Sequence, residues 1–574
     1  MTQHDESSSS DQIIGRIRDS VIGENHLIQT PYGSRRVTYA DYTASGRALT
    51  FIEDFIREMV LPSYANTHTE SSGTGLQTSR FREDARHIIR EAVGGDDDTI
   101  VIFTGSGSTA AIDKLVGVLG LRIPSQLEDT WGLSDYIPRD ERPVVFLGPY
   151  EHHSNELPWR ESIADVVVIR ADSDGGICQD HLKEELERFE HRPLKIGSFS
   201  AASNVTGIVS DTIGIAHLLH EYGALSFWDF AAAGPYIKIE MNPKADPSAY
   251  KDAVFLSPHK FIGGPSTPGV LVARRSLFGN RVPAVPGGGT VSFVNPQDHA
   301  YIADPTHREE GGTPAIVESI RAGLVFQLKE AVGASEIRRR EHRLLKRAFH
   351  TWREEPSLEI LGNMDAERLS IVSFTVRAPS GRYLHHNFVV TVLNDLFGIQ
   401  SRGGCSCAGP YGHTLLGIDM ERSHEFEREI SGGCEGIKPG WVRVNFNYFI
   451  SDEVADYIID AVRMVARDGW RLLGDYVFVP ESGRWLHRRG VIEARNGLSD
   501  VSYSADGTMS YGPPDQSGDE ALLKQHLLDA AEALASTPVP DVVTPPAGVT
   551  PQFEDLRWFD LPASSLGGIA PASR

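Results

Sequence analysis

Cysteines and long apolar runs are both scarce in this chain. The 574 residues include only four cysteines, too few for a disulfide framework, so we expect a reducing compartment. No run of about eighteen apolar residues is present, which argues against a membrane-spanning helix. The polar segment Met1–Ser10 lacks the apolar centre of a secretory signal. We therefore expect a cytoplasmic protein without a membrane partner.

Positive charge is also in deficit. The chain has 55 Lys and Arg against 78 Asp and Glu, a formal net charge of -23. Such an acidic surface repels nucleic acid and anionic lipid, so we expect neither as a partner. Local basic pockets for a phosphate or a carboxylate remain compatible with this balance. A hydrophobic fraction of 40% is ample for a large core, and the length suggests about two to four domains.

Short apolar runs alternate with helical patterns along the first half of the chain. The runs that we interpret as strands are 99–103, 143–147, 166–169, 196–199, 225–229, 252–256 and 269–273. This alternation predicts an α/β domain with a mostly parallel sheet. Polar motifs fall just after several of these strands, where open α/β sheets bind their ligands.

Composition divides the chain into four predicted parts. Residues 1–15 are Ser-rich and predicted to be a disordered tail. Residues 16–330 form the large domain, whose N-terminal segment lies partly with the small domain. Residues 331–474 form a small α+β domain, in which 441–446 alternates as a one-sided strand would. Residues 475–574 are an extension that ends in a flexible tail rich in Pro and Ala.

Lys260 is the most unusual residue of the large domain. It lies in the bend Ser257-Pro258-His259-Lys260 between two apolar runs. A lysine is seldom buried without a partner, because removing its ammonium group from water is costly. Condensation with a carbonyl cofactor to a Schiff base removes that cost. The alternative is a turn lysine that points to water.

Asp229 supplies a matching acid upstream. It ends the apolar run 225–229. Enzymes that use pyridoxal 5'-phosphate (PLP) need a carboxylate beside the pyridine nitrogen, so that the ring can act as an electron sink. A helix N-cap is the alternative role for this aspartate. Asp229 and Lys260 together are more specific for PLP than either residue alone.

A third motif fits a phosphate. The strand 99–103 runs into Thr104-Gly105-Ser106-Gly107-Ser108-Thr109 and then into a predicted helix. This arrangement presents backbone N–H groups, hydroxyls and a helix dipole to an anion. Many βα turns have the same composition, so the motif alone is weak.

Two cysteines stand one residue apart in the Gly-rich loop 401–412. The spacing of Cys405 and Cys407 is not that of common zinc sites, and no matching His or Cys pair lies nearby. We therefore expect no metal. A loop thiol is accessible and becomes a nucleophile when cations lower its pKa. Arg402 is a candidate for that role, or for binding a substrate carboxylate.

Seven motifs follow one another along residues 35–470. They are Glu151-His152-His153-Ser154-Asn155, Ser203-Asn204-Val205, Asp229, Ser257-Pro258-His259-Lys260, Gly287-Gly288-Gly289, Glu310-Gly311-Gly312-Thr313-Pro314 and Arg402-Gly403-Gly404-Cys405-Ser406-Cys407-Ala408. Together they resemble the PLP-dependent cysteine desulfurase and selenocysteine lyase family of the class V aminotransferases. The resemblance implies PLP fold type I, with a large α/β domain and a smaller α+β domain.

The resemblance also implies roles for individual residues. Lys260 would hold PLP, Asp229 would pair with its ring nitrogen, and His152 would stack on the ring. Cys407 would be the nucleophile that receives sulfur as a persulfide. The phosphate would be held by Ser108, Thr109, Ser257 and His259, and Thr313 would reach the phosphate of a neighbouring subunit in a homodimer. Asn204, Arg402 and His68 would border the substrate.

Three positions depart from the family pattern. Ala232 replaces a glutamine that usually follows the aspartate, and Ser406 replaces a frequent histidine. Cys405 is additional. The Cys-Ser-Cys sequence also resembles the sulfurase domain of molybdenum cofactor sulfurases, but the chain beyond 475 is too short for the usual C-terminal domain of that family. These departures bear on the reaction more than on PLP binding.

The sequence leaves three hypotheses. The first is a cysteine desulfurase-like enzyme that converts L-cysteine to L-alanine and a persulfide on Cys407, with a possible protein as sulfur acceptor. The second is another class V PLP enzyme, an epimerase, lyase or aminotransferase, in which the cysteines take no part. The third is a PLP-fold scaffold without enzymatic activity, acting through residues 475–574.

Overall fold

A computed structural model describes residues 3–67, 69, 71–490, 496–512, 516–539 and 549–566. Its largest element is a seven-stranded sheet with the order β4-β10-β9-β8-β7-β5-β6. The strands are β4 (Thr99–Thr104), β5 (Val144–Leu147), β6 (Asp165–Val168), β7 (Lys195–Ser200), β8 (Leu225–Asp229), β9 (Ala253–Leu256) and β10 (Gly269–Arg274). Only β10 runs antiparallel to its neighbours in this sheet. The predicted α/β fold with a mostly parallel sheet is confirmed.

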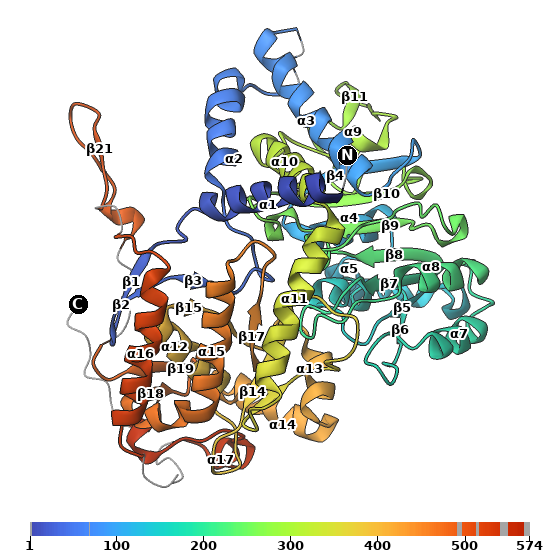
Figure 1. The fold of residues 1–574 in the computed structure, drawn as a ribbon. Coiled ribbons are helices and arrows are strands. Elements are labelled where there is room, and N and C mark those ends of the chain that lie inside the picture. Colours follow the sequence, from blue (N-terminus) through green and yellow to red (C-terminus); the bar gives the residue numbers. More distant parts are fainter. Residues whose placement is uncertain are drawn as a thin grey trace.

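Helices cover both faces of this sheet (Figure 1). The central strands β5, β7 and β9 are buried along their whole length, which explains why they read as continuous apolar runs rather than as alternating ones. The main helices of the large domain are α3 (Gly73–Ala92), α4 (Gly107–Val118), α7 (Gln179–Arg188), α8 (Thr212–Glu221) and α10 (Ile316–Val332). The carboxyl ends of the parallel strands therefore meet at one edge, where the site lies.

A smaller sheet forms the second domain, with the order β13-β14-β17-β16. Its strands are β13 (Leu358–Ile360), β14 (Ile371–Val376), β16 (Arg402–Gly404) and β17 (Trp441–Asn445), and its main helices are α12 (His386–Phe397) and α15 (Asp452–Asp468). The prediction that 441–446 is one-sided was wrong, because all five residues of β17 are buried. Arg443 donates from this strand to the Asn204 backbone oxygen of the large domain, so that domain covers a face that we expected to meet water.

The helical region between the two domains is divided into α10 and α11 (Ala334–Trp352). The division falls at Gly333, whose φ of 85° is strained for any residue with a Cβ. In Figure 1, α11 runs from the large domain to the small one. It is the connection between them.

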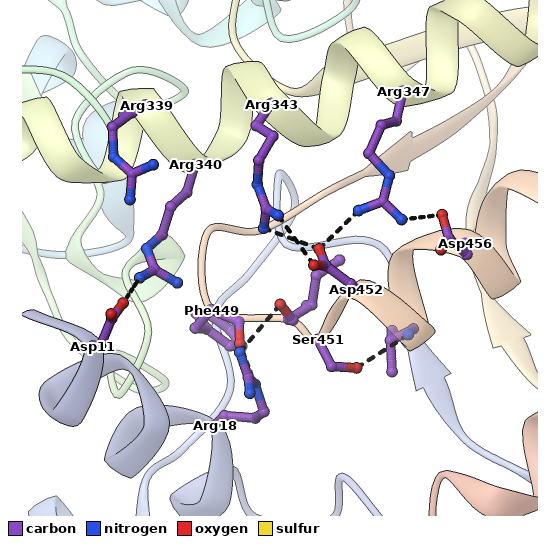
Figure 2. Close-up of polar contacts among 12 residues, drawn as sticks. Asp11, Arg18, Arg339, Arg340, Arg343, Arg347, Phe449, Ser451, Asp452 and Asp456 are labelled. Carbon is purple, nitrogen blue, oxygen red and sulfur yellow. Dashed lines mark hydrogen bonds and ion pairs between the residues drawn. The ribbon is translucent and has the colours of Figure 1, made fainter.

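The first residues differ from the disordered tail that we predicted for 1–15. Helix α1 spans Gln3–Ser20, and Ile14 and Ile17, three positions apart on one helix face, are buried in the main core. Arg18 Nε donates to the Phe449 backbone oxygen at 2.7 Å (Figure 2). The helix was not predicted because the serines that precede Ile14 and Ile17 dominate the composition of this segment.

Figure 2 shows how arginines of α11 hold the neighbouring helices. Arg340 pairs with Asp11 of α1. Arg343 and Arg347 contact Asp452 at 2.9 and 2.7 Å, at the first residue of α15. These pairs are partly exposed, so each contributes at most about 1 kcal/mol. They fix the positions of α1 and α15 against α11.

The C-terminal extension packs against the small domain. It contains the hairpin β18 (Tyr476–Val479) and β19 (Arg484–His487), helix α16 (Ala521–Ser536) and helix α17 (Pro551–Leu556). The predicted flexible tail was wrong for residues 549–566, because Phe553, Phe559 and Leu561 are fully buried. Trp558 Nε1 donates to the Ile437 backbone oxygen at 3.0 Å. Residues 540–548 and 567–574 of the predicted tail lie outside the described residues.

In the described part of the chain, no helix combines the length and the hydropathy needed to cross a membrane. Within the same residues, no group of three or more His, Cys, Asp or Glu side chains is arranged to hold a metal ion.

Candidate active site

A cavity of about 720 Å³ opens at the carboxyl edge of the large sheet. Lining residues from the large domain form what we call the lysine wall: residues 105–109, Asp229, Ala231, Ala232, Ser257, His259 and Lys260. Lining residues from the small domain form the arginine wall: Arg402, Ser406 and Arg443. Nine of the predicted site residues line the cavity, and eight of them belong to the large domain: Ser108, Thr109, His152, Asn204, Asp229, Ser257, His259 and Lys260. Arg402 lines it from the small domain.

Lys260 ends a single 3₁₀ turn, Pro258–Lys260, just after β9. Its backbone N–H donates to the Ser257 oxygen at 3.0 Å. The turn is held from outside by Gly46, whose N–H donates to the His259 oxygen at 2.8 Å. A Cβ at Gly46 would lie 1.9 Å from the Phe261 oxygen, so only glycine fits there. Burial lowers the pKa of Lys260 to about 8, although Asp229 opposes this shift.

Asp229 is the last residue of β8 and is buried. Its Oδ1 accepts a hydrogen bond from the Ala231 N–H at 2.8 Å. Burial raises the pKa of this carboxyl, while the Ala231 bond and the charge of Lys260 lower it. An acid and an amine thus face one cavity, each with a pKa shifted toward its neutral form.

The N-terminus of α4 also lines the cavity, together with Asp229 and Lys260. The Ser108 N–H donates to Ser257 Oγ at 2.8 Å, and Thr109 Oγ1 lies 2.6 Å from Ser154 Oγ. A Cβ at Gly107 would lie 2.9 Å from Ser257 Oγ. This turn therefore brings backbone and hydroxyl groups close to the cavity, as anion binding requires.

Two histidines of the cavity are neutral near pH 7. Burial lowers the pKa of His152 to about 3 and that of His259 to about 4, with Lys260 adding to both shifts. His152 Nδ1 accepts from the Ser154 N–H at 3.1 Å, so its proton resides on Nε2. A neutral, oriented imidazole suits stacking against an aromatic ring.

The arginine wall contains a residue that we missed. Arg443 of β17 lies opposite Arg402 of β16 in the antiparallel register, so both side chains lie on one face of the sheet. Asp41 Oδ1 lies 2.9 Å from Arg443 Nη2. Burial lowers the pKa of Arg443 while Asp41 raises it. An arginine inside an apolar strand was the available signal.

The cysteine loop forms a tight turn. Ser406 and Cys407 both adopt positive φ, 52° and 56°, and the Ala408 N–H donates to the Cys405 oxygen at 3.1 Å. Two left-handed residues closed by such a bond make a type I′-like turn, which normally uses Gly or Asn. Backbone strain of this kind, about 1 to 2 kcal/mol per residue, concentrates at functional sites.

The large domain clamps this turn from two sides. Asn204 Nδ2 donates to the Ser406 oxygen at 2.8 Å, and the His153 N–H donates to the Cys407 oxygen at 2.9 Å. Ser406 lines the cavity, whereas Cys407 and Cys405 do not and are partly buried beside it. Ser406 Oγ and Asn204 Oδ1 are buried and have no hydrogen-bond partner among the described residues.

The other positions that the resemblance singled out are Thr313, His68 and Ala232. Thr313 is exposed, does not line the cavity, and accepts a hydrogen bond from Asn66 Nδ2 at 3.3 Å. His68 lies outside the described residues. Ala232, in the place of the family's glutamine, lines the lysine wall.

A buried carboxylate behind the cavity also escaped prediction. Glu151 accepts hydrogen bonds from the Ser200 N–H at 2.9 Å and from Asn155 Nδ2 at 2.7 Å. Burial raises its pKa to about 7. It ties the ends of β5 and β7 together and so fixes the loop that carries His152.

Comparison with known proteins gives a consistent family. The sequence model of the Aminotransferase class-V family matches residues 38–422. A probable cysteine desulfurase of Halalkalibacterium halodurans is 27% identical over 378 residues, which are 65% of this chain and 84% of the relative. A probable cysteine desulfurase of Halobacterium salinarum is 26% identical over 398 residues, 69% of this chain and 88% of the relative.

Solved structures agree on the fold. An apo cysteine desulfurase from Thermococcus onnurineus superposes with a TM-score of 0.61 at 22% identity, covering 79% of this chain and 97% of the other. A cysteine desulfurase from Escherichia coli gives a TM-score of 0.57 at 19% identity, with 74% and 93% covered. The hairpin β18–β19 and helices α16 and α17 lie beyond the residues that the family model matches.

Proposed function

The chain belongs to the aminotransferase class-V family, and from this premise we propose that it is a PLP-dependent enzyme with cysteine desulfurase-like activity on an amino acid. The observation that carries the proposal is that Lys260 and Asp229 line one cavity together with the N-terminus of α4. An amine with a pKa of about 8, a buried acid and an anion-binding turn are the three groups that PLP requires.

The residues present fit the cofactor. Lys260 would hold PLP covalently, Asp229 would pair with its ring nitrogen, and His152 would lie against the ring. The phosphate would be bound by Ser108, Thr109, Ser257 and His259. When bound, PLP supplies an electron-withdrawing ring for a carbanion at the substrate α-carbon.

This chain's own residues then position the substrate and move its proton. Arg402 and Arg443 bind the substrate carboxylate, and Asn204 orients the amino acid between the two walls. Lys260, as a free neutral amine, removes the proton from the α-carbon. Its lowered pKa keeps a useful fraction of that amine neutral near pH 7.

The sulfur step involves the cysteine turn. The Cys407 thiolate attacks the sulfur of bound cysteine, so that a new S–S bond forms as the Cβ–S bond breaks. The electron pair of the broken bond stays on the substrate carbon and takes up a proton, which yields alanine. The sulfur remains on Cys407 as a persulfide for transfer to an acceptor, such as a second thiol or a protein.

A second candidate is a class V reaction without thiol chemistry. It is favoured by one observation: Ser406 lines the cavity, whereas Cys407 does not. In that case Ser406 contacts the substrate and the cysteines serve only to form the turn.

We further propose a homodimer in which Thr313 reaches the site of the other subunit. Its exposed position outside the cavity lining is compatible with this role. Light scattering of the purified protein tests it, and a monomer with full activity would contradict it.

The experiment that tests the function incubates the protein with L-cysteine and excess dithiothreitol, which reduces the persulfide and releases its outer sulfur as sulfide. Alanine, sulfide and the cofactor absorbance are followed together. We expect equal amounts of both products from the native protein and a loss of at least about a hundredfold in Cys407→Ala. Cys178→Ala is the matched control, because Cys178 lies at the start of α7 and outside the cavity lining. Full turnover of an amino acid by Cys407→Ala would favour the second candidate. If PLP produces no lysine-dependent absorbance, both candidates fail.

A further inference from the structure

A second cavity, of about 400 Å³, lies between α12, the segment that enters β16, and the hairpin β18–β19. We call it the hairpin cavity. In Figure 1, the hairpin lies beside α12, on the side of the small domain away from the large sheet. Residues of the C-terminal extension form one wall, and these residues lie beyond the class V match at 38–422. One wall of the cavity is thus built from residues outside the family match.

The hairpin wall offers hydrogen-bond donors that have no acceptor. Trp485 and His487 are only 2% and 5% exposed. Trp485 Nε1 and His487 Nε2 are buried and unpartnered within the described residues. His487 Nδ1 accepts from the Arg489 N–H at 3.0 Å, and burial lowers the pKa of His487 to about 4. The ring is therefore neutral with its proton on Nε2, which makes Nε2 a donor.

Leaving such N–H groups buried without an acceptor costs about 1 to 3 kcal/mol each. Arg484, at the exposed end of the same strand, adds a positive charge to this side of the cavity. Trp485 and His487 alternate with Arg484 along β19 and so share one face of the strand, and their two neutral donors match the two oxygens of a carboxylate.

The opposite wall carries the complementary charge. Asp395 of α12 is 3% exposed. It accepts hydrogen bonds from Tyr476 Oη at 3.0 Å and from Asn394 Nδ2 at 2.9 Å, one on each oxygen. Each carboxylate oxygen has a second lone pair, which can accept from an ammonium group. Ser401 Oγ is also buried and unpartnered within the described residues.

A molecule that carries a carboxylate at one end and an ammonium at the other fits this pair of walls. We propose that the hairpin cavity is a second binding site for a free amino acid, with its carboxylate on Trp485 and His487 and its ammonium toward Asp395. A volume of about 400 Å³ lies within the usual range for small-molecule sites, about 300 to 1,000 Å³.

Two short segments connect this site to the active site. Ser401 is followed directly by Arg402 of the arginine wall. Gln400 pairs with Tyr39 in the parallel ladder of β15 (Ile399–Gln400) and β3 (Thr38–Tyr39), two residues before Asp41, which holds Arg443. The proposal includes a coupling through these segments between an amino acid in the hairpin cavity and the two arginines that bind the substrate carboxylate. The coupling rests on the proposed function, whereas the binding does not.

The test is calorimetric titration of the full-length holoprotein with L-alanine, with the cofactor absorbance followed in parallel. We expect L-alanine to bind at two sites per chain. Binding at the active site changes the cofactor absorbance, whereas binding in the hairpin cavity, the silent site, does not. Asp395→Asn preserves shape, and Trp485→Phe removes the indole N–H while keeping an aromatic ring. Each should weaken the silent site at least tenfold, while the spectral change keeps its amplitude. Trp131→Phe is the control, because Trp131 is 66% exposed on α5 (Ser125–Trp131).

Each other outcome is decisive. The proposal is overturned if the titration shows a single site per chain. It is also overturned if L-alanine binds to the silent site of both variants with native affinity. Equally tight binding of N-acetyl-L-alanine to the silent site overturns the role of Asp395, because that probe lacks the ammonium group. If the absorbance never responds but binding still depends on Trp485, the second site stands and the proposed enzymatic function fails. Thermal denaturation of each variant verifies folding.

Discussion

The lysine wall and the arginine wall of the active-site cavity are built differently. On the lysine wall, two side chains already have hydrogen-bond partners within the protein: Ser257 Oγ accepts from the Ser108 N–H, and Asp229 Oδ1 accepts from the Ala231 N–H. On the arginine wall, Ser406 Oγ and Arg443 Nε are buried without a partner among the described residues. Ser406 and the adjacent Cys407 also have left-handed backbone.

This difference indicates a division of labour. A wall whose Ser and Asp side chains are already oriented by the protein's own hydrogen bonds is suited to hold a resident group in one orientation. A wall with unpartnered donors and stored strain gains most when a transient molecule supplies the missing contacts. We therefore expect changes on the lysine wall to alter kcat and cofactor attachment, and changes on the arginine wall to alter KM.

The largest effect is expected for Lys260→Ala. Without the amine, neither covalent attachment of PLP nor proton removal at the α-carbon can proceed, so kcat should fall at least about a thousandfold. Steady-state assay of amino acid turnover measures it. If Lys260→Ala retained more than a tenth of the native kcat, Lys260 would not be the group that removes the α-carbon proton.

On the arginine wall, Arg402→Gln should raise KM about ten- to a hundredfold and leave kcat within about threefold. A charge-assisted hydrogen bond to a carboxylate contributes about 1.5 to 3 kcal/mol, and Arg402 is exposed, so folding is unaffected. Arg339→Gln is the matched control, because Arg339 is 63% exposed on α11 (Figure 2). A fall in kcat with unchanged KM would contradict the assignment of Arg402 to substrate binding.

The pH dependence of cofactor attachment sharpens the role of Asp229. Attachment needs the neutral amine, so its rate should rise with pH and level off above the Lys260 pKa of about 8. The charge of Asp229 raises that pKa, so Asp229→Asn should move the midpoint to lower pH. Stopped-flow absorbance after adding PLP to cofactor-free protein measures the midpoint. A midpoint that stays in place or rises would show that the two groups do not interact.

The smallest effect is expected for Ser406→Ala. Loss of one neutral hydrogen bond to the substrate should raise KM about three- to tenfold, with kcat unchanged. Ser125→Ala, at an exposed position on α5, provides the control. An unchanged KM would mean that the hydroxyl of Ser406 does not contact the substrate.

The two walls also differ in how far the sequence predicts them. The lysine wall follows from local signals, since Asp229, Lys260 and the turn before α4 each end or follow an apolar strand. Arg443 was missed because alternation suggested that its strand had a solvent face, which the large domain instead covers. The turn at Ser406 and Cys407 was not predictable, because neither residue favours positive φ and only docking against Asn204 and His153 holds it.

The ends of the chain were mispredicted for a related reason. A serine-rich start and a Pro- and Ala-rich end resemble disordered segments in composition. The spacing of Ile14 and Ile17, and the aromatic pair Trp558 and Phe559, decide the outcome, because each buries apolar surface against another part of the chain. The overall composition of a segment does not reveal these few apolar residues, so it predicted disorder where the structure has buried helices and loops.

The central claim is that Lys260 is the covalent attachment point of PLP. Borohydride reduction of the PLP-loaded native protein, followed by peptide mass spectrometry, tests it most directly. The account predicts one pyridoxyl-phosphate adduct per chain, on Lys260. An adduct on another lysine, or no adduct in protein that turns over an amino acid, would contradict it.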